Sequence, residues 1–130
     1  MKVIFPAHPR IAKIIDISGI EIPPNVSMIE PLGYLDMINY LSKCKYVVTD
    51  SGGLQKEAYW MKKPCFTIRN ETEWIETVDS NWNTHVFDEI QNLADLLKNN
   101  HTPETWENLY GDGFAAEKIV NVISRQDKFI

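Results

Sequence analysis

The chain has 130 residues, of which 44% are hydrophobic and 24% charged, the size and composition of one globular domain with its own core. Its net charge of -5 argues against a nucleic-acid backbone or an anionic membrane surface as the main partner. No stretch approaches the roughly 18 apolar residues of a membrane span. Proline interrupts the start, MKVIFPAHPR, too early for a signal peptide, so we expect a cytoplasmic protein with free thiols at Cys44 and Cys65.

Short apolar runs alternate with segments that repeat apolar residues at helical spacing. Strands are predicted over residues 3–5, 26–29, 46–49, 64–68 and 84–87. Helices are predicted over residues 10–17, 33–43, 52–62, 88–98 and 115–123. A further helix is expected to begin at Thr102, because Pro103 and Glu104 suit a first turn.

This alternation predicts an α/β fold, a parallel sheet of about five strands with helices on both faces. We expect residues 1–130 to form a single nucleotide-binding domain. Ligands of such sheets bind outside the carboxyl ends of the strands. The polar stretches PAHPR, EPLGY, DSGG and RNETE each follow a predicted strand, so all four are candidates for one site.

The stretch DSGG stands where a strand passes into a helix. Gly52 and Gly53 allow a ligand to approach the backbone, and the helix that follows directs its first N–H groups and the positive end of its dipole at the same place. Ser51 adds a hydroxyl, and Glu57, one turn further on, suits the diol of a ribose better than a phosphate. A nucleoside diphosphate would satisfy both; a tight turn beside a surface glutamate is the plainer interpretation.

Three further positions have both a functional and a structural interpretation. His8 has an ordinary pKa near neutrality and could donate to a phosphate oxygen or move a proton, or it could simply end a strand. Arg10 could hold a diphosphate or stay solvated. The stretch RNETEWIET is either a solvated charged turn or a loop whose glutamates hold sugar hydroxyls or orient Arg69 and His8. No histidine or cysteine pair has the spacing of metal ligands, so no metal is expected.

Taken together, several stretches resemble the non-hydrolysing UDP-N-acetylglucosamine 2-epimerases in order and spacing. They are VIFPAHPR, IEPLGYLDM, VVTDSGGLQKEA, KPCFTIRNETEWIE, NWN and YGDGFAAEKIV. The resemblance implies a three-layer, Rossmann-like domain that is the C-terminal half of a glycosyltransferase-B type fold. It also implies an isomerase of polysaccharide biosynthesis that eliminates UDP from UDP-N-acetylglucosamine and adds it back to give UDP-N-acetylmannosamine, without metal or NAD.

The same resemblance assigns roles to individual residues. His8 and Glu73 are the expected catalytic residues, and UDP is the expected ligand. The residues implied in UDP binding are Arg10, Leu32, Tyr34, Met37, Ser51, Gly52, Gly53, Glu57 and Arg69, with Leu32, Tyr34 and Met37 placed at the uracil.

Two local departures from the family pattern stand out. The common family form Thr-Glu-Arg-Pro-Glu reads Thr-Glu-Trp-Ile-Glu from Thr72 to Glu76, and Lys56 stands where an acid is usual. The first change resembles a branch that acts on other UDP-2-acetamido sugars, including uronic acids. The sugar is therefore left open between these substrates.

By the resemblance, the 130 residues lack the N-terminal domain with its acidic catalytic residues, and also the first strand–helix unit of the C-terminal domain. We expect the strands to close the resulting gap in the order 2-1-3-4-5, because open central edges invite aggregation. The alternative is pairing with a second copy or with a separate chain that supplies the missing domain.

Three functions follow. The first is the UDP-binding part of a 2-epimerase, inactive as an isolated chain because the proton-abstracting carboxylates are absent. The second is a non-catalytic nucleotide-binding module, or the remnant of a truncated gene. A flavodoxin-like receiver is disfavoured, because its first loop would be acidic whereas here it reads PAHPR.

Overall fold

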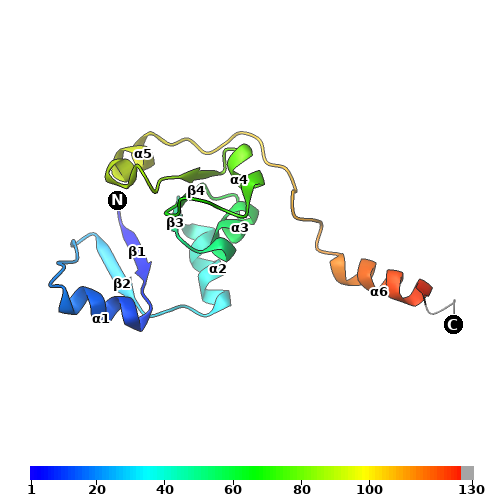
Figure 1. Ribbon diagram of the computed structural model, residues 1–130, viewed down its shortest axis with the longest axis horizontal. Coiled ribbons are helices and arrows are strands. Elements are labelled where there is room, and N and C mark those ends of the chain that lie inside the picture. Colours follow the sequence, from blue (N-terminus) through cyan, green and yellow to red (C-terminus); the bar gives the residue numbers. More distant parts are fainter. Residues whose placement is uncertain (127–130) are drawn as a thin grey trace. The chain divides into compact units, whose positions relative to one another are not determined.

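The computed structural model describes residues 1–126, which divide into two compact units, Met1–Lys43 and Cys44 onward (Figure 1). The predicted α/β class is confirmed, since strands and helices alternate and every strand pair is parallel. The single nucleotide-binding domain over residues 1–130 stays a prediction.

The first unit contains β1 (Val3–Pro6), α1 (Pro9–Ile17), β2 (Val26–Ile29) and α2 (Tyr34–Lys43). The two strands pair in parallel from Val3 with Val26 to Pro6 with Ile29. The loops that carry His8 and Leu32 therefore leave the same edge of this sheet.

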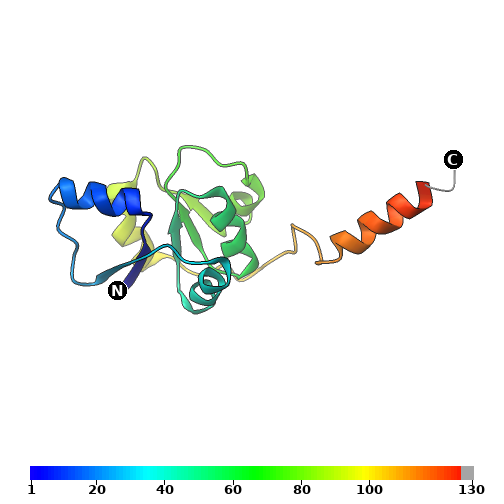
Figure 2. The ribbon, with the colours of Figure 1, turned by 90° about the horizontal axis from the view of Figure 1, so that it is seen from below.

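The second unit contains a sheet of β3 (Val47–Thr49), β4 (Cys65–Thr67) and β5 (Asn83–His85) in that order. Helix α3 (Gly52–Trp60) packs against β3 and β4, and the short α4 (Ile75–Asp79) packs against β5 (Figure 2). The 3-10 turn η1 (Ile90–Asn92) leads into α5 (Leu93–Asn99), and α6 (Ala115–Gln126) ends the described chain.

The core of the second unit forms where β4 meets the segments after β5. Phe66, Val86 and Leu97 are buried together, with Tyr46 packed edge-on against the Phe66 ring at 5.9 Å between centroids. Cys65 is buried in the same strand, and both cysteines are free, as predicted.

Within the units, the described strands pair as a two-stranded sheet, β1–β2, and a three-stranded sheet, β3–β4–β5. The joining of the two sheets in the order 2-1-3-4-5 stays a prediction. In each sheet the strands follow one another in chain order. A helix connects each strand to the next, so strands that are neighbours in the chain are also neighbours in the sheet.

The helix expected from Thr102 is also wrong, because residues 100–114 contain no regular helix. Tertiary hydrogen bonds hold this segment instead: the Trp82 indole donates to the Thr105 carbonyl oxygen at 2.8 Å, and the Tyr59 hydroxyl donates to that of Glu107 at 2.8 Å. These bonds come from residues 23 and 48 positions away and outweigh the local signal.

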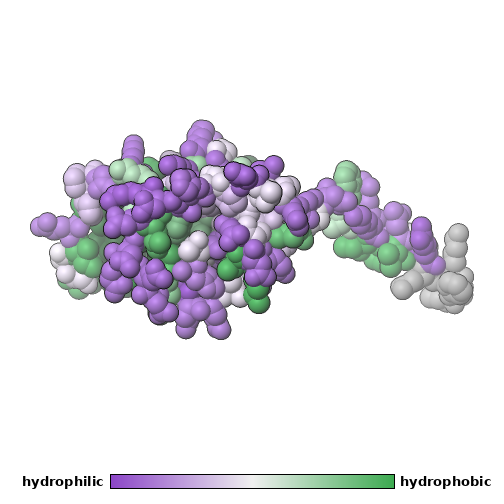
Figure 3. Space-filling view, turned by 90° about the horizontal axis from the view of Figure 1, so that it is seen from above, coloured by the Kyte–Doolittle hydropathy of each residue, from purple (hydrophilic) through white to green (hydrophobic). Residues whose placement is uncertain are grey.

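Two helices expose apolar faces. In α1, Ile14 is 54% exposed, and no residue of this helix is buried. In α6, Ile119, Val122 and Ile123 lie along one side and line a shallow apolar hollow with the stem of Lys118 (Figure 3). Among the helices of residues 1–126, none combines the length and the hydropathy needed to cross a bilayer.

Candidate functional site

The site in the second unit is built on the turn from β3 into α3. Ser51 is the N-cap: its Oγ accepts from the backbone N–H of Leu54 at 3.5 Å, and its own N–H donates to Thr49 Oγ1 at 3.0 Å. Ser51 and Gly53 are exposed, so the N–H groups of the first turn face accessible space. The dipole of this nine-residue helix adds partial positive charge at the same point.

Gly52 lies against the loop that follows β4. A Cβ atom at this position would overlap Glu73 Oε1, the end of a flexible side chain, and come 3.1 Å from Glu73 Cδ, so a side chain here would displace the carboxylate. The Glu73 carboxylate in turn pairs with Arg69 across 3.2 Å. Three predicted site residues are therefore brought together with the N-terminus of α3, and the Glu73 side chain covers part of it.

This cover is weakly held. The side chains of Arg69 and Glu73 are 35% and 53% exposed, and ion pairs this open contribute about 0–1 kcal/mol. The carboxylate can therefore leave the first turn at small cost when an anion arrives. Glu57, the predicted ribose ligand, is half-buried on the next turn of α3.

Behind the loop lies a buried polar network that the sequence did not reveal. Gln55 Oε1 accepts from Thr72 Oγ1 at 2.6 Å and from Asn83 Nδ2 at 3.1 Å. Asn83 Oδ1 accepts from Thr67 Oγ1 at 2.7 Å, and Asn83 Nδ2 also reaches Thr77 Oγ1 at 3.2 Å. These bonds tie α3, the loop after β4, and the start of α4 to the sheet.

A second feature that the sequence did not reveal surrounds Lys56. Its Nζ lies 4.7 Å from the ring centroid of Trp74, 5.0 Å from that of Tyr110 and 5.2 Å from that of Trp60. Tyr110 meets both indoles edge-on, at 5.7 Å and 6.1 Å. We call Lys56 with these three rings the aromatic cage.

Two polar atoms near the cage, Trp74 Nε1 and Gln55 Nε2, are buried without a hydrogen-bond partner among the described residues. The Tyr110 hydroxyl lies beside the Glu76 carboxylate. Burial, together with the nearby Glu76 carboxylate, raises the pKa of Tyr110 to about 12. The phenol therefore stays neutral at physiological pH, and the positive charge of Lys56 meets uncharged rings.

The predicted residues of the first unit lie at the carboxyl edge of β1 and β2. His8 is the N-cap of α1, and its Nδ1 accepts from the backbone N–H of Arg10 at 3.2 Å. This bond leaves Nε2 as the free ring nitrogen. Both side chains are exposed.

The three residues expected at the uracil stand at the start of α2, after β2. Leu32 and Met37 are half-buried, whereas Tyr34 is 64% exposed. Their loop leaves the same edge of the two-stranded sheet as His8, which agrees with the parallel register. The first unit thus brings together five predicted residues and the second unit six.

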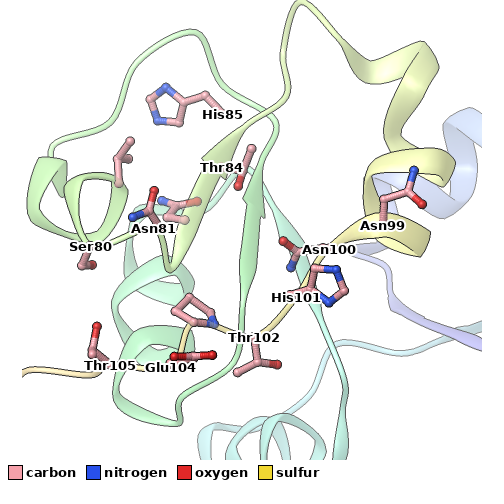
Figure 4. Close-up of a pocket in the computed structure, with 13 residues that line it drawn as sticks. Ser80, Asn81, Thr84, His85, Asn99, Asn100, His101, Thr102, Glu104 and Thr105 are labelled. Atoms are coloured by element: carbon pink, nitrogen blue, oxygen red, sulfur yellow. The ribbon is translucent and has the colours of Figure 1, made fainter.

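A hollow of the second unit lies elsewhere, along β5. It measures about 870 Å³, and its wall is formed by the end of α4, the turn after it, β5 and residues 99–105. Figure 4 shows that its labelled polar side chains, among them His85, His101 and Glu104, are spread around the rim and do not converge on one point. Within residues 1–126, no group of three His, Cys, Asp or Glu side chains could hold a metal ion.

A family model described as UDP-N-acetylglucosamine 2-epimerase matches residues 1–124. The chain is 42% identical over 127 residues to a UDP-N-acetylglucosamine 2-epimerase homolog of Methanococcus maripaludis, covering 94% of this chain and 36% of the relative. It is 36% identical to the UDP-2,3-diacetamido-2,3-dideoxy-D-glucuronate 2-epimerase of Pseudomonas aeruginosa, covering 95% and 35%.

Solved structures of proteins from the same family are also similar to this chain. The S. aureus MnaA–UDP complex matches with a TM-score of 0.81 and 31% identity, covering 99% of this chain and 37% of that one. The Methanocaldococcus jannaschii UDP-GlcNAc 2-epimerase in complex with UDP-GlcNAc and UDP matches with a TM-score of 0.80 and 32% identity, covering 95% and 36%. The chain thus spans a little over a third of the length of the relatives it matches.

Proposed function

Because the chain belongs to the UDP-N-acetylglucosamine 2-epimerase family, we propose that it is the UDP-binding part of a sugar-nucleotide 2-epimerase. The observation that carries the proposal is the accessible N-terminus of α3, where Ser51, Gly52 and Gly53 follow β3 directly. A diphosphate suits this place, since backbone N–H groups, a hydroxyl and the helix dipole all favour negative charge.

The proposed reaction interconverts UDP-N-acetylglucosamine and UDP-N-acetylmannosamine. A base removes the C2 proton, the C1–O bond breaks, and the bonding electrons leave with UDP; the glycal that remains takes UDP back at C1 and a proton at C2 from the other face. Donors at the diphosphate lower the barrier because charge develops on the departing group. Neither metal nor NAD enters this scheme.

Individual residues take the following proposed roles. Ser51, Gly52 and Gly53 hold the diphosphate, and Glu57 accepts hydrogen bonds from the ribose. Leu32, Tyr34 and Met37 contact the uracil. His8 donates to the diphosphate through Nε2, with Arg10 and Arg69 adding positive charge, and Glu73 serves the sugar end. As an isolated chain we expect UDP binding without epimerisation, in the cytoplasm, until a chain or domain with the missing carboxylates joins it.

The sugar has a second candidate. The identity to the Pseudomonas aeruginosa diacetamido-glucuronate 2-epimerase is 36%, and Trp74 replaces the arginine of the common family form. A UDP-2-acetamido uronic acid is therefore the alternative substrate. A non-catalytic UDP-binding module is the alternative to an enzyme.

The test is ligand-observed NMR. Saturation transfer to UDP is expected with the wild-type chain and is expected to be lost in Ser51→Trp, whose indole would fill the diphosphate position. Ser124→Trp on the exposed face of α6 is the matched control and is expected to bind as the wild type does. Absence of transfer to the wild-type chain, or equal transfer to Ser51→Trp, would refute the proposed site. Turnover of UDP-N-acetylglucosamine by this chain would refute its inactivity.

A further inference from the structure

We propose that the aromatic cage is a positioning device that holds the backbone at Glu73 beside the first turn of α3. The proposal rests on the proposed function, since it concerns the residue placed at the sugar end of the UDP site. Lys56, Trp60, Trp74 and Tyr110 do not touch the substrate in this view; they set where Glu73 stands.

The contacts lead directly from the cage to Glu73. The residue after Glu73 is Trp74, whose ring lies under the ammonium group of Lys56. The residue before it is Thr72, whose hydroxyl donates to Gln55 and accepts from the Trp74 backbone N–H at 3.1 Å. Both neighbours of Glu73 in the chain are therefore bound to α3. The Glu73 carboxylate lies against Gly52, the first residue of the same helix.

The positive charge is what holds this arrangement. Among the described residues the Lys56 ammonium is in no ion pair, and its close neighbours are three ring faces. The Trp74 N–H has no hydrogen-bond partner among the described residues that would fix its ring. An ammonium over several aromatic faces is attracted to each of them, which orients the rings around it.

The two local departures from the family pattern are thereby in contact. Lys56 stands where an acid is usual, and Trp74 stands where the common form has arginine. In this chain the pair meets as a cation over an aromatic face at 4.7 Å. This contact joins α3 to the loop after β4.

The test compares amide exchange in three variants of this chain. Lys56→Met keeps the length of the side chain and removes the charge, and exchange of the Trp74 and Thr77 amides is expected to become about tenfold faster. Lys56→Arg keeps a cation and is expected to exchange as the wild type does. Lys62→Met removes the contact of Lys62 with Trp106, 4.5 Å away and outside the cage, and is expected to leave both amides unchanged.

The amides of β4, from Cys65 to Thr67, serve as the internal reference. Unchanged exchange at Trp74 and Thr77 in Lys56→Met overturns the proposal, and so does a rise that includes β4, because the lysine would then only stabilise the unit. An arginine variant that behaves like the methionine variant also overturns it. No nucleotide is present in this experiment, so its failure is distinct from a failure to bind UDP.

Discussion

The absence of a side chain at Gly52 leaves room both for a ligand and for the side chain of Glu73. It opens the first turn of α3 to an approaching ligand, and it leaves room for the Glu73 carboxylate. Gly53, the next residue, has no such neighbour, since a Cβ there would meet only Ser51 Oγ at 4.0 Å. The two glycines therefore differ in what they allow, and substitution can separate them.

We predict that Gly52→Ala moves Glu73 without unfolding the chain. The new methyl group displaces a flexible carboxylate and costs the ion pair with Arg69, about 0–1 kcal/mol, while alanine favours the helix by about 0.5–1 kcal/mol. The free energy of unfolding in urea should therefore change by less than about 1 kcal/mol, while the NMR signal of the Glu73 carboxyl carbon shifts. Gly53→Ala is the control, and an equal shift there would contradict the explanation.

The elements were predictable where local pattern and tertiary environment agree. The strand–loop–helix order, the start of α3 at Gly52 and the polar loops at the strand ends follow from periodicity and glycine placement. The segment after Asn100 was mispredicted because its conformation depends on Tyr59 and Trp82, far away in the chain. The aromatic cage was not predicted for the same reason: Tyr110 contacts Lys56 from 54 positions away in the sequence.

The sheet and α3 are joined by Asn83, which lies in β5 and is 3% exposed. We predict that Asn83→Leu, which has a similar volume, destabilises the chain by about 2–4 kcal/mol, because the Thr67 hydroxyl and the Gln55 amide lose partners while still buried. Urea unfolding measures the loss. Thr84→Val, on the exposed side of the same strand, is the control and should change stability by no more than about 0.5 kcal/mol. A neutral Asn83→Leu would show that the network contributes little.

At high pH, we expect the ionisation of buried thiols in the second unit to lower the stability of the chain. Burial raises the pKa of the Cys65 thiol from 9.0 to about 12, and that of Cys44 is raised by burial as well. Both thiols are therefore protonated in the folded chain at neutral pH. Neither is poised as a nucleophile, which agrees with the proposed site, in which no thiol takes part.

The raised pKa of Cys65 determines the direction in which the stability of the chain changes with pH. A thiol whose pKa is higher in the folded chain contributes stability fully below pH 9, and this contribution is lost as the pH rises toward about 12. We predict that the urea midpoint of the wild type falls over this range more steeply than that of Cys65→Val. Parallel curves for the two proteins would show that Cys65 keeps an ordinary pKa.

The distribution of indole rings has a practical consequence. All four tryptophans, Trp60, Trp74, Trp82 and Trp106, belong to the second unit, and none lies in Met1–Lys43. Intrinsic emission excited at the red edge therefore comes only from indole rings of the second unit. The first unit is followed through its two tyrosines, Tyr34 and Tyr40, or by far-ultraviolet dichroism.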